Sequence, residues 1–248
     1  MTGEHSGLGA GGMIPAFLSI AMPVYNEEQT IRETVQACVE KVAGRFERFE
    51  IIVADDASRD GTAQALRDLR QRIPELRVLR SDRNLGHGAT LQRALNTVEG
   101  SWVFVIDSDY QHDPGDFWRL FQLAGERTIV MGWREERVDA LYRHVASVSG
   151  NYFIRAFCGM RIRDINIPFK LFPGPVLKNL LATLPPRALV PSTLLIVGAG
   201  LSGMAIRQVP VAHLPRRHGA STLPGLRFAF FAIRAAVELL RYRVEFKS

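Results

Sequence analysis

The sequence predicts an α/β fold in which a mostly parallel sheet is flanked by helices and followed by a C-terminal helix. Short runs rich in β-branched and aromatic residues alternate with amphipathic stretches of helical length, which is the pattern of consecutive βαβ units. Runs such as EIIVAD are continuously apolar, as expected of strands that are covered on both faces. With 248 residues, 47% of them hydrophobic and 23% charged, the chain is long enough to bury one substantial core.

The predicted strands and helices alternate along most of the chain. The strand runs are FLSIAMPV (17–24), FEIIVAD (49–55), RVLRS (77–81), WVFVID (102–107) and TIVMGW (128–133). The helical stretches cover roughly residues 27–43, 60–73, 86–98, 114–124 and 139–158, and a further helix is expected over 173–184. Residues 188–206 carry no charge and just reach the length of a membrane span. Because Pro191 and several glycines interrupt this run, a buried helix, a turn and a strand are the favoured interpretation.

The two ends of the chain differ from this pattern. Residues 1–13 are Gly-rich and lack an apolar core segment, so we expect a flexible tail rather than a signal peptide. Residues 224–248 predict a basic amphipathic helix, in which Arg227, Arg234 and Arg241 recur every seven residues and share one face. A central arginine makes a spanning helix costly, whereas a helix lying in the membrane interface fits. A terminal helix that packs on the core or on a second copy is the alternative.

The net charge and the two cysteines indicate which partners and which cellular compartment to expect. The 31 basic and 25 acidic residues give a formal net charge of +6, which suits anionic partners but is also an ordinary charge for solubility. Basic residues are not clustered with aromatic ones in a recognised pattern, so we expect no nucleic-acid partner. Cys38 and Cys158 lie in apolar, helix-like stretches without the spacing of a metal site. They predict buried free thiols in a reducing, cytoplasmic compartment.

The strongest local signal is Asp107-Ser108-Asp109, at the end of the run WVFVID. In open α/β sheets, ligands bind beyond the carboxyl ends of the strands. Two carboxylates so close together are electrostatically costly unless a cation neutralises them, and Mg²⁺ or Mn²⁺ prefers oxygen ligands and bridges to substrate phosphates. Gln111 adds a neutral oxygen two residues further on. The sequence therefore predicts a Mg²⁺ or Mn²⁺ site formed by Asp107, Asp109 and Gln111.

Three further polar segments fall at the same predicted rim. EIIVADDASRDGT places Asp55 and Asp56 at a strand end, where a carboxylate accepts hydrogen bonds from a base or a ribose. The alternative is a turn followed by a helix N-cap that uses Ser58 or Asp60. In AMPVYNEE, Tyr25 is placed to pack against a base, while the glutamates also favour a helix N-terminus. RNLGHG (83–88) opens a helix, and its glycines and helix start suit a phosphate.

Taken together, PVYNEE, DDASRDGT, RNLGHG and DSDYQHDP resemble the motifs of the family-2 glycosyltransferases with the GT-A fold, in the family's order and spacing. The resemblance covers roughly residues 17–222 and implies a GT-A domain over 14–223. It also implies an enzyme that uses a nucleotide-sugar donor and a metal-bound diphosphate. The resemblance implies that the donor is bound by Pro23, Tyr25, Glu27, Asp55, Asp56, Asn84, Gly86 and Asp107.

The second half of the chain points to the kind of acceptor. An alcohol needs a general base, and no clear ED or QxxRW motif is present downstream to supply one. A phosphate monoester is already an oxyanion and needs only cations to position it. The later motifs resemble those of the polyprenyl-phosphate sugar synthases, with GWR at Arg134, RxxxS at Arg143 and Ser147, and RxxGxS at Arg216 and Ser221. A DxxxGF(K/R)-like segment runs from Asp164 to Lys170.

This resemblance implies an inverting, metal-dependent transfer of a hexose from a GDP- or UDP-linked donor to a polyprenyl phosphate, at the inner membrane face. The implied catalytic residues are Asp109, Arg134, Arg143 and Arg216. The implied acceptor-binding residues are Arg134, Arg143, Ser147, Asp164, Lys170, Arg216 and Ser221. Pro168 stands where the subgroup usually has Gly, so a different small-molecule, natural-product or cell-envelope acceptor stays open. A non-catalytic nucleotide- or membrane-binding module is the remaining alternative.

Overall fold

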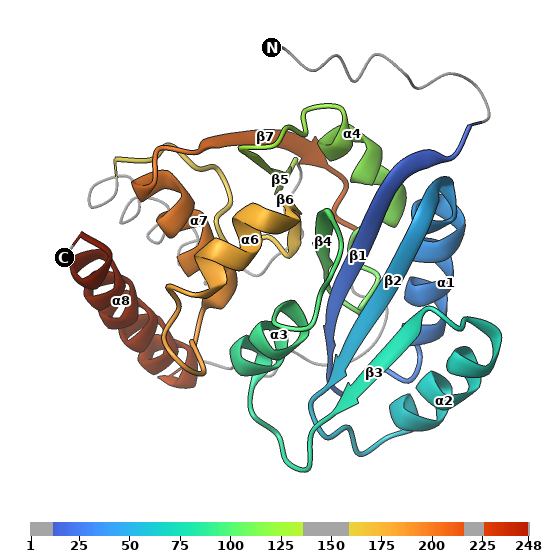
Figure 1. Ribbon diagram of the computed structural model, residues 1–248. Coiled ribbons are helices and arrows are strands. Elements are labelled where there is room, and N and C mark those ends of the chain that lie inside the picture. Colours follow the sequence, from blue (N-terminus) through green and yellow to red (C-terminus); the bar gives the residue numbers. More distant parts are fainter. Residues whose placement is uncertain (1–11, 136–158, 216–225, 248) are drawn as a thin grey trace.

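The computed structural model describes residues 12–135, 159–215 and 226–247, and its centre is one seven-stranded sheet (Figure 1). The strands are β1 (Ile14–Val24), β2 (Phe46–Asp55), β3 (Leu76–Arg80), β4 (Trp102–Ile106), β5 (Thr128–Arg134), β6 (Phe169–Pro173) and β7 (Ala205–Val211). Their order in the sheet is β3-β2-β1-β4-β6-β5-β7. All five strands predicted from the first half of the sequence are present, and the mostly parallel α/β fold is confirmed.

Strand β6 is the exception to the parallel arrangement, and it was not predicted. It lies between β4 and β5 and runs antiparallel to both, with Ile106 opposite Phe169 and Val130 opposite Leu171. The remaining pairs, from β3 to β4 and between β5 and β7, are parallel. All five residues of β4 and of β6 are buried, as expected of the continuously apolar β4, whereas β6 buries one charged residue, Lys170.

The helices agree with the sequence pattern in place but are shorter than predicted. They are α1 (Ile31–Lys41), α2 (Thr62–Arg72), α3 (His87–Leu95), α4 (Phe117–Phe121), α6 (Gly174–Leu181), α7 (Pro191–Leu201) and α8 (Leu226–Lys247). Helix α1 starts later than expected because the Glu27 carbonyl accepts the amides of Thr30 and Ile31 in a turn. The stretch predicted over 114–124 divides into a 3₁₀ turn, Pro114–Asp116, and α4. The helix expected over 139–158 lies outside the described residues, as does Cys158.

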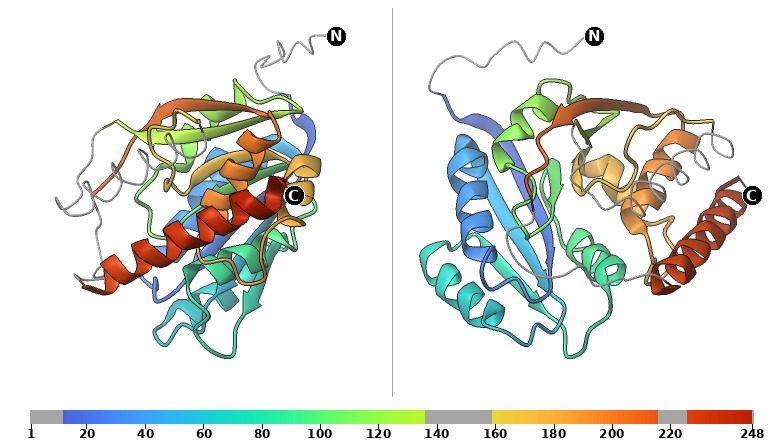
Figure 2. Two further views of the ribbon diagram at one scale, coloured as in Figure 1. Left: turned by 90° about the vertical axis from the view of Figure 1, so that its left-hand side faces the viewer. Right: turned by 180° about the vertical axis from the view of Figure 1, so that it is seen from behind.

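The helices cover the sheet in two groups. Helices α1 and α2 lie beside β1, β2 and β3, whereas α6, α7 and α8 lie together at the other end of the molecule (Figures 1 and 2). Between them the core is rich in aromatic rings. Phe104 of β4 meets Phe117 at 5.1 Å and Phe169 at 4.8 Å between ring centroids, in edge-to-face contacts. Cys38 is buried in α1, and burial raises the pKa of its thiol to about 12, as expected of an inert cysteine.

The uncharged run 188–206 forms a buried helix, a turn and the start of a strand, as predicted. Helix α7 is followed by a turn in which Gly203 has φ +68°, and β7 begins at Ala205. Within the described ranges, no helix combines the length and the apolar character that crossing a membrane requires. Helix α8 (Leu226–Lys247) lies within residues 224–248, where the C-terminal helix was expected.

Candidate active site

Asp107 and Asp109 lie directly beyond the carboxyl end of β4. The Asp109 carboxylate accepts the backbone N–H of Gln111 at 3.2 Å, so the turn is closed by one of the candidate ligands. Oδ1 of Asp107 is buried and has no hydrogen-bond partner among the residues that the structure describes. A buried carboxylate oxygen left in this state is costly, and a cation would satisfy it.

Charges around Asp107 act in both directions on its ionisation. The pKa of this carboxyl is raised to about 6, chiefly by burial and in smaller part by the neighbouring charge of Asp109. The charges of His87, Lys170 and Arg134 lower that pKa and so favour the ionised form. Near neutral pH, a bound cation would therefore compete with a proton for the carboxylate of Asp107.

Three strand ends near this site carry strained backbone. Asn26, Ala57 and Tyr110 follow β1, β2 and β4, and each adopts a positive φ of 54° to 60° although none is a glycine. Such residues gather where the surrounding structure fixes an unusual turn, often at a binding site. The three turns are adjacent at one edge of the sheet because their strands are neighbours there. Sequence reasoning did not find this feature.

A segment that follows β7 packs against the Asp107–Asp109 turn. The Leu214 amide donates to the Gln111 carbonyl at 2.8 Å, and the side-chain Nε2 of Gln111 lies 3.4 Å from Nε2 of His213. The ring Nδ1 of buried His112 lies 3.0 Å from the Ala212 carbonyl. These contacts bring His213 to the site, which sequence reasoning missed because it is about a hundred residues away in the chain.

The donor set at this turn fits Mg²⁺ or Mn²⁺. It consists of two carboxylates and one amide, Asp107, Asp109 and Gln111, all of which offer oxygen. In the described part of the chain, no group of three or more His, Cys, Asp or Glu side chains is arranged to hold a metal. A cation that uses few protein ligands and completes its shell with water and substrate phosphates suits such a set.

Asp56 shapes the loop that leads into α3. Its two oxygens accept the amides of Leu85 at 2.6 Å and Gly86 at 2.9 Å, and its carbonyl lies 3.5 Å from Nδ2 of Asn84. Gly86 has φ +88°, a conformation that favours glycine, and α3 starts at the next residue. The motifs DDASRDGT and RNLGHG are thus joined through one buried carboxylate.

The neighbouring Asp55 is fixed within its own turn. Its Oδ1 accepts the Ser58 amide at 2.9 Å, and its Oδ2 lies 3.2 Å from a guanidinium nitrogen of Arg80. The residue before α2 is Gly61, so neither Ser58 nor Asp60 is the N-cap that the sequence offered, although Asp60 accepts the Thr62 amide at 3.0 Å.

The PVYNEE turn is tied to the same loop. The Asn26 amide donates to Oγ of Ser58 at 3.0 Å, and the Glu27 amide donates to Oγ1 of Thr62 at 2.8 Å. Glu28 accepts the Gly61 amide at 2.7 Å. Pro23 is buried in β1, while Tyr25 and Glu27 are half-buried at the rim. The predicted donor residues of the first two motifs therefore share one rigid edge.

The residues expected at the acceptor are only partly described. Arg134, at the end of β5, forms a 3.0 Å ion pair with buried Asp164. Lys170 is fully buried and donates to the Ile167 carbonyl and, at 2.7 Å, to Oγ of Ser192; burial lowers its pKa to about 7. In this arrangement Lys170 supports its neighbours and is not open to a ligand. Four other expected residues lie outside the described ranges, namely Arg143, Ser147, Arg216 and Ser221.

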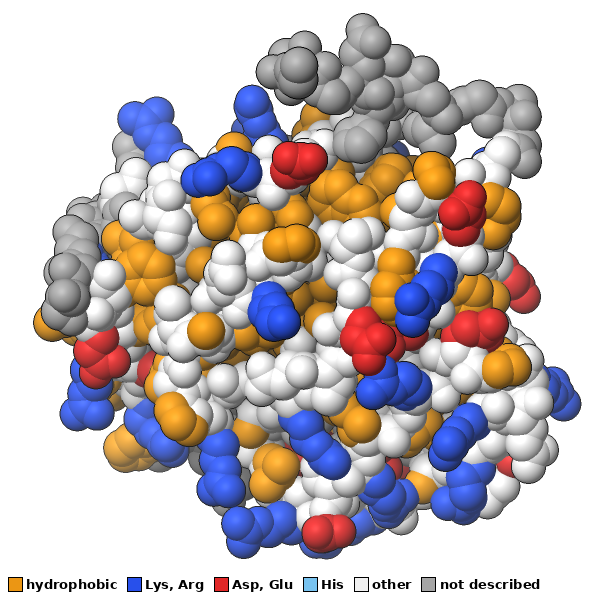
Figure 3. Space-filling model, in the orientation of Figure 1, with side chains coloured by type: hydrophobic (Ala, Val, Ile, Leu, Met, Phe, Trp, Pro, Cys, Tyr) orange, Lys and Arg blue, Asp and Glu red, His pale blue; other side chains and the backbone are white. Residues whose placement is uncertain are grey.

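Positive charge gathers at the same edge. Figure 3 shows Lys and Arg side chains along the lower border of the molecule, the border toward which β1 and β2 run in Figure 1. Exposed arginines on or beside the loops of this edge are Arg59, Arg80, Arg83 and Arg187. A basic rim around a pair of carboxylates suits a ligand that carries both phosphates and a bound cation.

The model of the family described as "Glycosyl transferase family 2" matches residues 19–176. The chain belongs to glycosyl transferase family 2. All four motif segments of this family-2 chain, from PVYNEE to DSDYQHDP, lie inside the matched region.

Two known proteins that are similar to this family-2 chain have a polyprenyl phosphate in their names. The chain is 27% identical over 208 residues to dodecaprenyl-phosphate galacturonate synthase of Rhizobium johnstonii, covering 82% of this chain and 61% of that protein. It is 29% identical over 208 residues to undecaprenyl-phosphate 4-deoxy-4-formamido-L-arabinose transferase of Edwardsiella ictaluri, covering 83% and 62%. The chain thus spans about three fifths of the length of these relatives.

A solved structure shares the fold of this family-2 chain. It is glucosyl-3-phosphoglycerate synthase of Mycobacterium tuberculosis in complex with Mn²⁺, UDP and glucosyl-3-phosphoglycerate. The TM-score is 0.68 at 22% identity, and the alignment covers 92% of this chain and 80% of the other. At this identity the similarity establishes the fold.

Proposed function

We propose that this chain is an inverting, metal-dependent glycosyltransferase that moves a hexose from a nucleotide-sugar to a polyprenyl phosphate. The observation that carries the proposal is the pair Asp107 and Asp109 at the carboxyl end of β4, with a buried carboxylate oxygen that lacks a partner in the described structure. The names of the two relatives, both polyprenyl-phosphate sugar transferases, support this acceptor. The UDP and Mn²⁺ of the similar structure support a UDP-linked donor and a divalent cation, and a GDP-linked donor is the alternative.

Asp107, Asp109 and Gln111 would hold Mg²⁺ or Mn²⁺. When bound, the cation supplies positive charge to the diphosphate that leaves with the nucleotide. The chain's own residues would orient the donor: Asp56 and Tyr25 at the nucleoside, and the loop of Asn84 and Gly86, at the start of α3, beside the phosphates. Their mutual hydrogen bonds fix this edge before any ligand arrives, so little ordering is needed on binding.

The acceptor phosphate needs no general base, because its oxygen is already anionic at neutral pH. In the proposal, Arg134, Arg143 and Arg216 position that oxyanion for attack on the anomeric carbon, with Ser147 and Ser221 as hydrogen-bond donors. Asp164 holds Arg134 by the 3.0 Å ion pair and orients its guanidinium. Buried Lys170 does not contact the acceptor in this proposal; its positive charge lowers the pKa of Asp107.

The direct test is transfer from labelled UDP- or GDP-hexoses to a polyprenyl phosphate with Mg²⁺ or Mn²⁺. We expect product with one donor, and a loss on the order of 100-fold or more in Asp109→Asn. The matched control is Asp68→Asn, which makes the same change on α2, far from the strand ends. Absence of transfer from every donor, with nucleotide binding intact, would refute the polyprenyl phosphate acceptor, and absence of transfer to any acceptor offered would indicate a non-catalytic binding module.

A second candidate keeps the same donor chemistry but uses another acceptor, such as a soluble phosphate ester or a cell-envelope intermediate. Two observations favour it: Pro168 precedes β6, and the similar structure holds a phosphoglycerate product. Replacing polyprenyl phosphate by phosphoglycerate in the same assay separates the two candidates, because each predicts transfer in one arm only.

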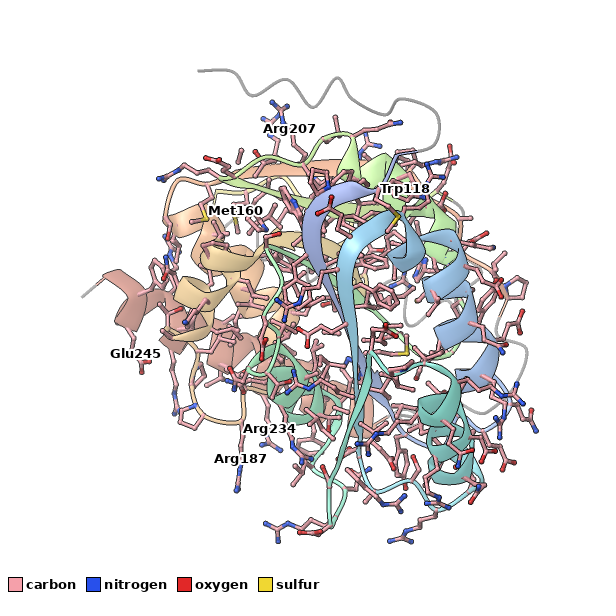
Figure 4. All side chains as sticks on the ribbon, turned by 45° about the vertical axis from the view of Figure 1, so that its right-hand side comes forward. Trp118, Met160, Arg187, Arg207, Arg234 and Glu245 are labelled. Atoms are coloured by element: carbon pink, nitrogen blue, oxygen red, sulfur yellow. The ribbon has the colours of Figure 1, made fainter. Side chains whose placement is uncertain are left out.

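We also propose that α8 lies on a membrane surface, where a polyprenyl phosphate resides. Five large apolar side chains of α8, between 39% and 70% exposed, form one face that we call the apolar stripe. The apolar stripe consists of Phe230, Ile233, Val237, Leu240 and Val244. The exposed Arg234 and Arg241 lie beside it, a combination typical of interfacial helices. Figure 4 shows Arg234 and Arg187 pointing the same way from the body, at the edge opposite to Arg207.

Sedimentation with lipid vesicles tests this placement. The chain should bind vesicles that contain anionic lipid more strongly than neutral ones, and added salt should weaken the binding. Ile233→Asp combined with Val237→Asp should abolish it, whereas Leu123→Asp, which removes an exposed apolar side chain beyond α4, should not. Binding that survives the α8 double substitution would disprove the membrane role, and a change from dimer to monomer would assign the apolar stripe to a second copy.

A further inference from the structure

The segment 185–192 leads from the loop after α6 into the first two residues of α7, and one carboxylate of α8 holds it. Glu238 accepts the backbone amides of Leu189 at 2.9 Å and of Val190 at 3.1 Å. Helix α7 begins at Pro191, and the side chain of Val190 offers no cap, so these amides lie at the positive end of a helix. Glu238 therefore caps α7 from a different helix, and the charge makes both hydrogen bonds stronger than neutral ones.

The same segment fits closely against the first turns of α3. A Cβ placed on Gly88 would lie 2.2 Å from the Leu189 carbonyl oxygen and 2.6 Å from that of Ala188, so only glycine permits this approach. One turn further along α3, Gln92 accepts the Ala188 amide at 2.9 Å and donates to the Pro185 carbonyl at 3.1 Å. The position of the segment therefore sets the position of the start of α3.

Two parts of the candidate site adjoin this segment. His87, the first residue of α3, directly follows Gly86, whose amide donates to Asp56 at 2.9 Å. On the other side, Oγ of Ser192 accepts a hydrogen bond from Lys170 at 2.7 Å. Lys170 lies on β6 next to Phe169, which pairs with Ile106, the residue before Asp107. One short segment therefore borders both the loop held by Asp56 and the strand beside Asp107.

We propose that Glu238 is a positioning residue of the donor site, although it lies on the C-terminal helix, beyond the region that matches the family. By holding Leu189 and Val190, it fixes the segment against which α3 starts and to which Lys170 is bonded. The inference rests on the proposed function, in which Asp107 holds the metal-bound diphosphate. It makes α8, the helix that carries the apolar stripe, a part of the support of the site.

The test compares the full chain with Glu238→Ala and Glu238→Gln. We expect Glu238→Ala to weaken the affinity for UDP or GDP in the presence of Mn²⁺ about tenfold, as for residues that support a metal site from behind. Glu238→Gln keeps an oxygen acceptor and should stay within about threefold of the wild type. In Glu238→Ala, amide hydrogen exchange should rise in residues 188–190 and also in the first turn of α3, residues 87–90.

The matched control is Tyr242→Phe, which removes the 2.7 Å hydrogen bond between Tyr242 and Thr183 but leaves Glu238 in place. It should loosen α8 without changing nucleotide affinity or exchange in α3. Exchange that rises only on α8 and in 188–190 would overturn the inference, as would an equal loss of affinity in Tyr242→Phe. A wild-type chain that binds neither nucleotide would refute the proposed function, and hydrogen exchange would still decide the role of Glu238.

Discussion

Gly88 is the position at which a single methyl group should disturb the candidate site most. In Gly88→Ala the new Cβ would meet two carbonyl oxygens, of Leu189 at 2.2 Å and of Ala188 at 2.6 Å. Both belong to backbone, so no change of rotamer relieves the contact. The segment 185–192 or the start of α3 must move, and the hydrogen bonds of Gln92 to that segment must lengthen.

The magnitude follows from two opposing effects. Inserting a methylene into a close-packed contact costs about 1–3 kcal/mol. Gly88 lies inside α3 without a positive φ, so alanine returns up to about 1 kcal/mol of helix propensity. We expect a net loss of about 1–2 kcal/mol in the free energy of unfolding, together with weaker nucleotide binding.

Urea unfolding followed by circular dichroism measures this loss, and titration with UDP or GDP and Mn²⁺ measures the effect on the site. Gly115→Ala is the control, because its Cβ would meet only side-chain atoms, Asp113 Oδ1 at 3.3 Å and Lys41 Cδ at 3.6 Å. An unfolding midpoint for Gly88→Ala at or above that of the wild type would show that the segment yields freely, and the reasoning would then be wrong.

Three further predictions concern the charged groups. The pKa of Asp107 in the free chain is raised to about 6, so its carboxylate is ionised above that pH and protonated below it. Because the cation needs the ionised form, calorimetry should show the Mn²⁺ affinity falling about tenfold between pH 7 and pH 5. Arg134→Met removes the ion pair with buried Asp164 and should lower the free energy of unfolding in urea by about 3–5 kcal/mol. The double substitution Arg134→Met with Asp164→Leu should lose less, because it leaves no unpaired buried charge. Glu50 is buried and accepts the Ser19 hydroxyl at 2.6 Å, so Glu50→Ala should lower stability by about 2–4 kcal/mol in thermal unfolding; an unchanged melting temperature would contradict this.

The parts of the site that sequence could predict are local. Asp107, Asp109 and Asp56 each follow an apolar run that forms a strand, so both the chemistry and the position are written in neighbouring residues. Strand β6 escaped prediction because FKLFP is short and pairs with β4 and β5, which are distant in the chain. Its sequence, four apolar residues and one lysine, is compatible with several kinds of buried segment.

Other features depend on contacts that no local pattern encodes. Asn26, Ala57 and Tyr110 adopt positive φ angles although none is a glycine, so no glycine in the sequence marks these three turns. His213 reaches Gln111, and Glu238 reaches Leu189, only because the sheet and the helices around it bring distant segments together. Sequence reasoning proposed ligands for the candidate site but did not identify the residues that support them.

The reversed direction of β6 changes which part of the chain lies beside the candidate site. In a parallel strand the residues that come after it reach the functional rim, whereas in β6 the residues that come before it do so, because Ile106 pairs with Phe169. The loop with Asp164 and Ile167, which leads into β6, therefore lies next to the turn of Asp107. An inverted strand thus places a loop that precedes β6 and a turn that follows β4 side by side, and we expect substitutions in residues 164–168 to change the proposed acceptor site while leaving the turns proposed to bind the donor intact.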